Sequence, residues 1–174
     1  MVNPGSKPVL PFAIRKATEA DAEAIVAILE GIASERIYTA ISRPWSKDRQ
    51  RQHLTSLSAR EAIHVAETEP GAVIGYLPLE LWAPTLDSMS HVGQIGTFLK
   101  PEWRRRGVGE ALFRRAVEFA RQRDYLKFVI QVRASNISAQ GFYRRLGFCE
   151  CGRLNRQVRI GAQEDDEIIM EFFL

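Results

Sequence analysis

The sequence predicts a mixed α/β (α+β) domain, because strand-like and helix-like hydrophobic patterns share one chain without strict alternation. The chain has 174 residues, of which 45% are hydrophobic and 26% are charged, as in an ordinary folded domain. No run approaches 18 uninterrupted apolar residues, so we expect no membrane span. We expect a flexible tail over residues 1–10 and a single domain over residues 11–174.

One strand, two helices and a β-hairpin are expected in the N-terminal half. Thr18 and Asp21 have the spacing of a capping box, which predicts the start of the first helix. The Glu69-Pro70-Gly71 turn between two strand-like runs predicts the hairpin. The expected elements are a strand over 11–16, a helix ending near 34, a more polar helix over 46–60, and strands over 62–68 and 72–82.

The C-terminal half alternates strands and helices before it ends in two strands. Its expected elements are a strand over 91–100, a helix over 107–123, a strand over 126–132, a helix over 136–146, and strands near 148–154 and 167–173. Pro101 stops the first of these strands. The whole order predicts a mixed central sheet of six to seven strands flanked by about four helices, and it excludes an alternating Rossmann array.

Charge is unevenly distributed along the chain. The 24 Lys and Arg exceed the 21 Asp and Glu by only three, but Arg104, Arg105 and Arg106 run together. A local site for a small polyanion explains this run as well as a nucleic-acid surface does, so nucleic-acid binding rests on charge alone. Two cysteines, Cys149 and Cys151, cannot build a disulfide framework or a zinc site, which favours a reducing, cytoplasmic location.

The strongest motif is a strand followed by Arg104-x-x-Gly107-x-Gly109 at the start of a helix. Glycines let the backbone turn tightly and direct consecutive N–H groups at an anion. The positive end of the helix points at the same place. This pattern predicts a pyrophosphate site, and it is neither a Walker loop nor the dinucleotide G-x-G-x-x-G pattern.

A second motif follows the strand over 126–132. Asn136 and Tyr143 are seven residues apart, so they lie on one face of the expected helix. Taken singly, Asn136 is explained by a helix N-cap and Tyr143 by a core aromatic residue with a satisfied hydroxyl.

Together the two motifs resemble the Gcn5-related N-acetyltransferase (GNAT) family from Phe12 to about Phe173, most closely from Val92 to Phe148. The resemblance rests on three segments in family order: Thr97-Phe98-Leu99-Lys100-Pro101, Arg104-x-x-Gly107-x-Gly109, and Asn136…Ala139…Tyr143…Gly147-Phe148. It implies the GNAT fold, in which splayed strands of the central sheet form an acetyl-CoA cleft.

The resemblance implies an enzyme that takes its acetyl group from acetyl-CoA and needs no metal. The backbone of Thr97, Phe98 and Leu99 would pair with the pantetheine arm, in a splay between that strand and the strand over 128–132. The other cofactor-binding residues that it implies are Arg104, Arg105, Arg106, Gly107, Val108, Gly109, Glu110, Asn136 and Tyr143.

The implied reaction is direct attack of an amine on the thioester in a ternary complex. Tyr143 is expected to protonate the leaving thiolate. The general base that would deprotonate the amine is not at the position that the resemblance implies. Gln131 occupies the position at which the ribosomal-protein-acetylating branch has a glutamate. His91 and Glu80 are the candidate bases, and solvent alone is the remaining option.

The acceptor is expected to be a small primary amine, such as an amino acid or a related amine. Tyr38, Trp45 and Trp82 would wall its pocket, and Arg36 or Arg43 would hold a carboxylate. Acetylation of a protein N-terminus or lysine is the alternative within the class. A non-catalytic acyl-CoA-binding sensor is the alternative from another class. We expect no nucleic-acid or membrane partner, and a homodimer is consistent with the family's habit of pairing through late strands.

Overall fold

The computed structural model describes residues 11–69 and 71–174. The tail expected over residues 1–10 lies outside the described residues, as does Pro70 of the hairpin turn. The strands are β1 (Ala13–Lys16), β2 (Ala62–Thr68), β3 (Ala72–Leu81), β4 (Val92–Ile95), β5 (Phe98–Leu99), β6 (Lys127–Arg133), β7 (Cys149–Ile160) and β8 (Gln163–Phe173). The helices are α1 (Ala22–Ser34), α2 (Lys47–Ser56), α3 (Val108–Arg121) and α4 (Ile137–Arg145).

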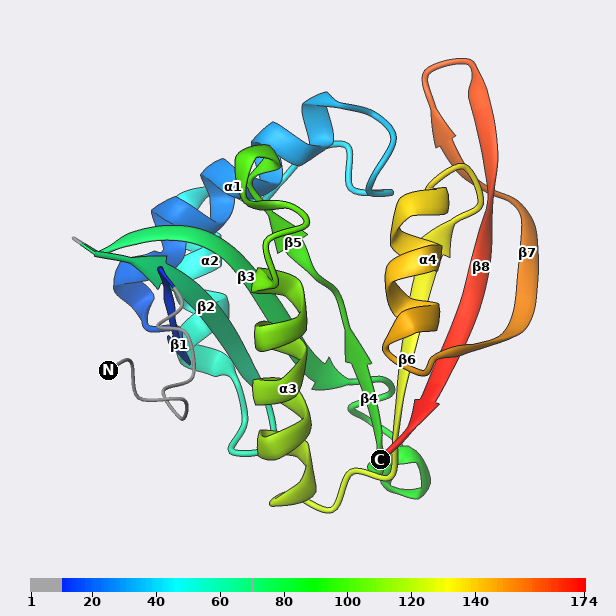
Figure 1. Cartoon of the computed structure of the whole chain (residues 1–174). Coiled ribbons are helices and arrows are strands. Elements are labelled where there is room, and N and C mark those ends of the chain that lie inside the picture. Colours follow the sequence, from blue (N-terminus) through cyan, green and yellow to red (C-terminus); the bar gives the residue numbers. More distant parts are fainter. Residues whose placement is uncertain (1–10, 70) are drawn as a thin grey trace, which may run out of the picture.

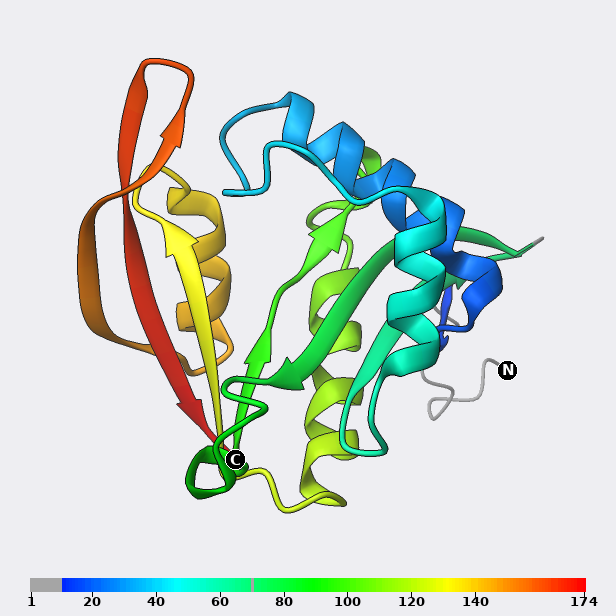
Figure 2. The same cartoon turned by 180° about the vertical axis from the view of Figure 1, so that it is seen from behind.

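All eight strands belong to one mixed sheet, in the order β1-β2-β3-β4-β6-β8-β7, with β5 paired to β3. Helices α3 and α4 cover one face of this sheet, and α1 and α2 cover the other (Figure 1 and Figure 2). The expected fold class and element order are confirmed. None of the described helices combines the length and the apolar content that a membrane crossing requires.

The strand count exceeds the expected six to seven because the strand over 91–100 is broken into β4 and β5. Ile95 pairs with Leu79 and Phe98 pairs with Tyr76, so the break lies opposite residues 77 and 78 of β3. Residue 78 is Pro78, which has no N–H to donate to a neighbouring strand. The break therefore occurs where β3 offers one donor fewer.

The parallel pair β4–β6 opens after three residue pairs. Val92 pairs with Lys127, and the last pair joins Gln94 to Val129. Beyond this point β5 bonds only to β3, and β6 bonds to β8 on its other side. Figure 1 shows β5 and β6 diverging from the end where β4 and β6 meet. The splay that the resemblance implied is therefore present, and it leaves one backbone edge of β5 free.

Helix α3 is held to the sheet by an apolar stripe that begins in its first turn. Val108, Leu112 and Ala116 are fully buried in the main core cluster. This stripe follows the 3.6-residue period of an amphipathic helix. Because Val108 is buried, the first turn of α3 is fixed relative to the end of β5, which positions the site described below.

The β7–β8 hairpin is longer than the expected strands over 148–154 and 167–173. In the outer half of β7 Val158 is buried and most other residues are exposed, so this half lacks the alternation of apolar and polar residues that marks a half-buried strand. The missing apolar signal explains why the sequence predicted shorter strands.

Candidate active site

The loop before α3 is shaped to bind an anion. Arg105 (φ 59°) and Gly107 (φ 80°) both adopt the left-handed conformation, two residues apart. When left-handed residues alternate with residues of negative φ, successive backbone N–H groups point into one concavity, which is called a nest. Gly107 is the N-cap of α3 and provides no side-chain cap, so N–H groups of the first turn remain available. This backbone has the geometry of an anion site at the place where the sequence motif predicts a pyrophosphate.

The remaining backbone of the motif continues into the first turn of α3. Gly109 is buried, and a Cβ there would lie 3.0 Å from a ring carbon of Phe142 and 3.5 Å from the Thr97 methyl. Glycine therefore allows α3 to approach both α4 and the end of β4. Glu110 is exposed and pairs with Arg114, so only its backbone faces the loop.

The three arginines of the motif have different environments. Arg104 donates from Nη1 and Nη2 to both carboxylate oxygens of Glu35, at 3.1 and 2.5 Å, and stacks 4.5 Å from the ring centroid of Tyr38. Arg105 and Arg106 are exposed at the surface beside Gly107. Arg104 therefore joins the loop to the end of α1, whereas Arg105 and Arg106 remain accessible to an anion.

Tyr143 lies beside the opening between β5 and β6. Its hydroxyl donates to Thr97 Oγ1 at 3.0 Å, and its side chain is only 3% exposed. Burial raises the pKa of Tyr143 well above its ordinary value, so the phenol stays protonated. Thr97 stands in the break between β4 and β5, which places the phenol at the free backbone edge expected to hold the pantetheine arm.

Asn136 has a structural role in this geometry. Its Oδ1 accepts from the Ala139 N–H at 3.0 Å, which makes it the N-cap of α4. Its Nδ2 donates to the Tyr38 carbonyl at 3.3 Å. Asn136 and Arg104 thus hold the segment after α1 from two sides of the splay.

A cavity of about 380 Å³ lies on the opposite face of the sheet, between α1, α2 and strands β3 to β5. Trp45, His53 and Glu80 form one side of it. His53 Nε2 is 2.8 Å from Glu80 Oε1, and the His53 ring stacks edge-on with Trp45 at 5.0 Å. This hydrogen bond to the Glu80 carboxylate raises the pKa of His53.

Glu80 lies on β3 beside the point where β4 and β6 separate. It pairs with Gln94 across β3 and β4, and Gln94 is also the last residue of β4 to pair with β6. His91 precedes β4 at its other end, where its carbonyl accepts from the Leu126 N–H at 2.9 Å. Of the two expected bases, the structure therefore brings Glu80 and not His91 to the cavity. His53 is a partner that sequence spacing did not reveal.

Only part of the expected acceptor wall lines this cavity. Trp45 does so, whereas Tyr38 stacks under Arg104 and Trp82 follows β3 outside the lining. Arg36 and Arg43 are both exposed, and neither is a lining residue. The structure thus provides an aromatic wall without the expected arginine.

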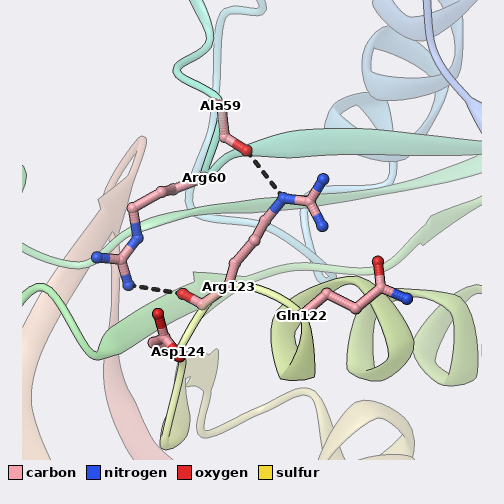
Figure 3. Close-up of a pocket in the computed structure, with 5 residues that line it drawn as sticks. All are labelled: Ala59, Arg60, Gln122, Arg123 and Asp124. Atoms are coloured by element: carbon pink, nitrogen blue, oxygen red, sulfur yellow. Dashed lines mark hydrogen bonds between the residues drawn. The ribbon is translucent and has the colours of Figure 1, made fainter.

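A second cavity, of about 410 Å³, lies at the C-terminal end of α3. Its arginines donate hydrogen bonds to backbone carbonyls. Arg60 Nη2 donates to the Arg123 carbonyl, and Arg123 Nε donates to the Ala59 carbonyl, both at 2.9 Å (Figure 3). It lies at the far end of α3 from Gly107 and contains none of the expected site residues. These contacts tie the segment before β2 to α3, and the cavity is separate from the splay.

A model of the acetyltransferase (GNAT) family matches residues 32–148. A protein from Bacillus subtilis (strain 168), provisionally named as an alanine N-acetyltransferase of ribosomal protein bS18, is 32% identical over 109 residues, 63% of this chain and 67% of the relative. The crystal structure of a ribosomal-protein-alanine N-acetyltransferase from Brucella melitensis is similar at a TM-score of 0.84 and 26% identity, covering 93% of this chain and 99% of that one.

A phosphinothricin acetyltransferase from Sinorhizobium meliloti, solved in complex with AcCoA, has the same fold at a TM-score of 0.86. It is 22% identical, and the match covers 94% of this chain and 89% of that one. The family match confirms the expected acetyl-CoA-dependent N-acetyltransferase, and the chain belongs to the acetyltransferase (GNAT) family.

Proposed function

We propose that this protein transfers an acetyl group from acetyl-CoA to a small primary amine by direct attack within a ternary complex. The main support is the arrangement around the splay. The nest at Gly107 lies at one end, and Tyr143 and Glu80 lie on opposite faces of the sheet beside the opening. A donor held between β5 and β6 would therefore be accessible to an acid on one face and to an amine on the other.

The donor is proposed to bind through backbone groups. The N–H groups from Arg105 to Glu110 would hold the pyrophosphate, and Arg105 and Arg106 would add charge. The free edge of residues 97–99 would pair with the pantetheine arm as an added strand does. Arg104 and Asn136 act on this site indirectly, because their side chains hold the segment after α1.

The acceptor must lose a proton before it attacks, because α-amines have pKa values of about 7.7–8.0 and lysine about 10.4. We propose that the Glu80–His53 pair accepts this proton, directly or through one water. The pair lies in the cavity beside the splay, with its two side chains 2.8 Å apart. His53 holds the Glu80 carboxylate in place at its Oε1.

Tyr143 is the proposed acid. Acetyl-CoA, when bound, supplies the acetyl group as a thioester, so a C–N bond forms as the C–S bond breaks. The Tyr143 hydroxyl donates its proton to the departing sulfur and regains one from solvent. One proton is released overall, from the ammonium form of the acceptor.

A protein N-terminus is the second candidate acceptor. It is favoured by the names of the Bacillus subtilis and Brucella melitensis relatives, both of which refer to ribosomal-protein alanine. We propose the small amine first, because the cavity of about 380 Å³ lies at the small end of the range for small-molecule sites. The low cysteine content supports a cytoplasmic location, which we likewise propose.

Release of free CoA thiol against a panel of amines tests the proposal. Small amines are expected to give turnover, and acetyl-CoA is expected to raise the melting temperature in a concentration-dependent way. Stabilisation by acetyl-CoA without turnover on any amine or peptide would instead indicate a non-catalytic acyl-CoA-binding sensor. Faster turnover on peptides than on any small amine would support the second candidate.

A further inference from the structure

The cavity on the α1–α2 side of the sheet is apolar over most of its lining. Ile41, Trp45 and Phe98 are among its lining residues, together with aliphatic side chains of α1 and β2. The lining side chains that carry polar groups are those of Gln50, His53, Tyr76, Glu80 and Gln94. Neither lysine nor arginine occurs among the described lining residues. Among the described lining residues Glu80 is the one carboxylate, and its hydrogen-bond partner there is His53.

Several arginines of the surrounding segments lie outside this lining. Arg104 is bound to Glu35, and Arg133 is buried and donates to Asp165 at 2.8 Å. Arg133 also donates to the carbonyl of Arg36, whose own side chain is exposed. Arg49 stacks 4.5 Å from the ring centroid of Trp45 without joining the lining. A carboxylate inside the cavity would therefore find no arginine partner there.

These features discriminate between acceptor classes. An ammonium group is attracted to the Glu80 carboxylate, and an apolar body replaces water against Trp45, Ile41 and Phe98. A carboxylate on the same molecule would find no lysine or arginine among the described lining residues and would lose its hydration against apolar walls. The cavity thus favours an amine over the corresponding amino acid.

We infer that the acceptor is a primary amine with an apolar body and no carboxylate, bound with its nitrogen at Glu80 and His53. The inference rests on the proposed function and narrows its substrate class, away from the amino acid that the sequence suggested. Size agrees with this choice, because about 380 Å³ accommodates an aryl-alkyl or branched alkyl chain.

Matched pairs of acceptors test the inference in the CoA-release assay. Phenethylamine should exceed phenylalanine, and 3-methylbutylamine should exceed leucine, by at least about 10-fold in kcat/KM, which corresponds to about 1.4 kcal/mol. Phenylalaninamide, which keeps the size of the carboxylate without its charge, should resemble phenethylamine. Equal or faster turnover of the amino acids would overturn the inference while leaving the acetyltransferase proposal intact. Faster turnover of a peptide with an apolar first residue would overturn it in favour of a protein acceptor, and no turnover at all would instead overturn the proposed function.

Two substitutions at the cavity add a test of location. Ile41 is 41% exposed, so Ile41→Arg should fold and should shift the preference toward the amino acid by at least about 5-fold. Trp45→Ala should lower kcat/KM for phenethylamine, whereas Trp82→Ala, outside the lining, should leave it unchanged. An unchanged amine-to-acid ratio in Ile41→Arg, with the melting temperature preserved, would place the acceptor elsewhere.

Discussion

Removing the Tyr143 hydroxyl separates the proposed catalytic role of this residue from its structural one. The phenol makes a single hydrogen bond, to Thr97 Oγ1 at 3.0 Å, and its ring is buried against Phe142 and Phe148. Tyr143→Phe keeps the ring and its packing. The variant therefore loses one neutral hydrogen bond and the proposed acid, and nothing else.

The two losses differ in size. A neutral hydrogen bond contributes about 0.5–1.5 kcal/mol to the free energy of unfolding, so the melting temperature should fall by about 2–4 °C in a chain of this length. Loss of a general acid lowers turnover by about 10²–10⁴-fold. The dissociation constant for acetyl-CoA should change far less than turnover, because the phenol contributes only one contact.

Tyr125→Phe is the matched control. Tyr125 is also buried, and its hydroxyl also donates a single 3.0 Å hydrogen bond, to the Arg60 carbonyl at the other end of α3. Both variants should lose similar stability, but only Tyr143→Phe should lose turnover in the CoA-release assay. If turnover falls equally in the two variants, Tyr143 is not the acid.

Three further predictions follow from the site and the core. Gly107→Ala should raise the acetyl-CoA dissociation constant by about 10-fold or more in calorimetry, whereas Gly71→Ala, at φ 97° in an open turn, should cost similar stability, about 1 kcal/mol, without changing binding. Glu80→Gln should lower turnover by about 10²-fold and move the pKa of His53 down toward its ordinary value in NMR titration; an unchanged His53 titration would contradict the pairing. Burial beside Arg115, Lys16 and Arg123 lowers the pKa of His64 from 6.5 to about 4. Because the unfolded chain binds this proton at a higher pH than the folded chain, the free energy of unfolding should fall by about 3 kcal/mol between pH 6.5 and 4. His64→Met should remove this pH dependence in urea denaturation.

Local patterns predicted most of the fold. The apolar stripe of α3, the Pro101 stop and the glycine turn at Gly107 are encoded within a few residues, and the structure has them where expected. The break between β4 and β5 was missed, because it depends on Pro78 of the neighbouring strand. The length of the β7–β8 hairpin was missed because most residues in the outer half of β7 are exposed, with Val158 as the buried exception.

The parts of the site that lie within a few consecutive residues were predicted from the sequence, and the contacts between residues far apart in the sequence were missed. The nest needs only the residues from Arg105 to Gly109, so its motif was readable. The pairs Arg104–Glu35 and His53–Glu80 join residues 69 and 27 positions apart. No spacing rule links such partners in one sequence. The sequence therefore suggested Arg104 as a phosphate ligand and did not indicate His53 as a partner of the candidate base.

Hydrogen–deuterium exchange with and without acetyl-CoA reports directly where the donor binds. We expect slower exchange of backbone amides in residues 96–99 and 105–110, with little change along β7. Free CoA should give the same pattern, because the pyrophosphate and the pantetheine arm are common to both. Protection confined to residues 59–60 and 122–124, around the cavity at the far end of α3, would contradict donor binding between β5 and β6.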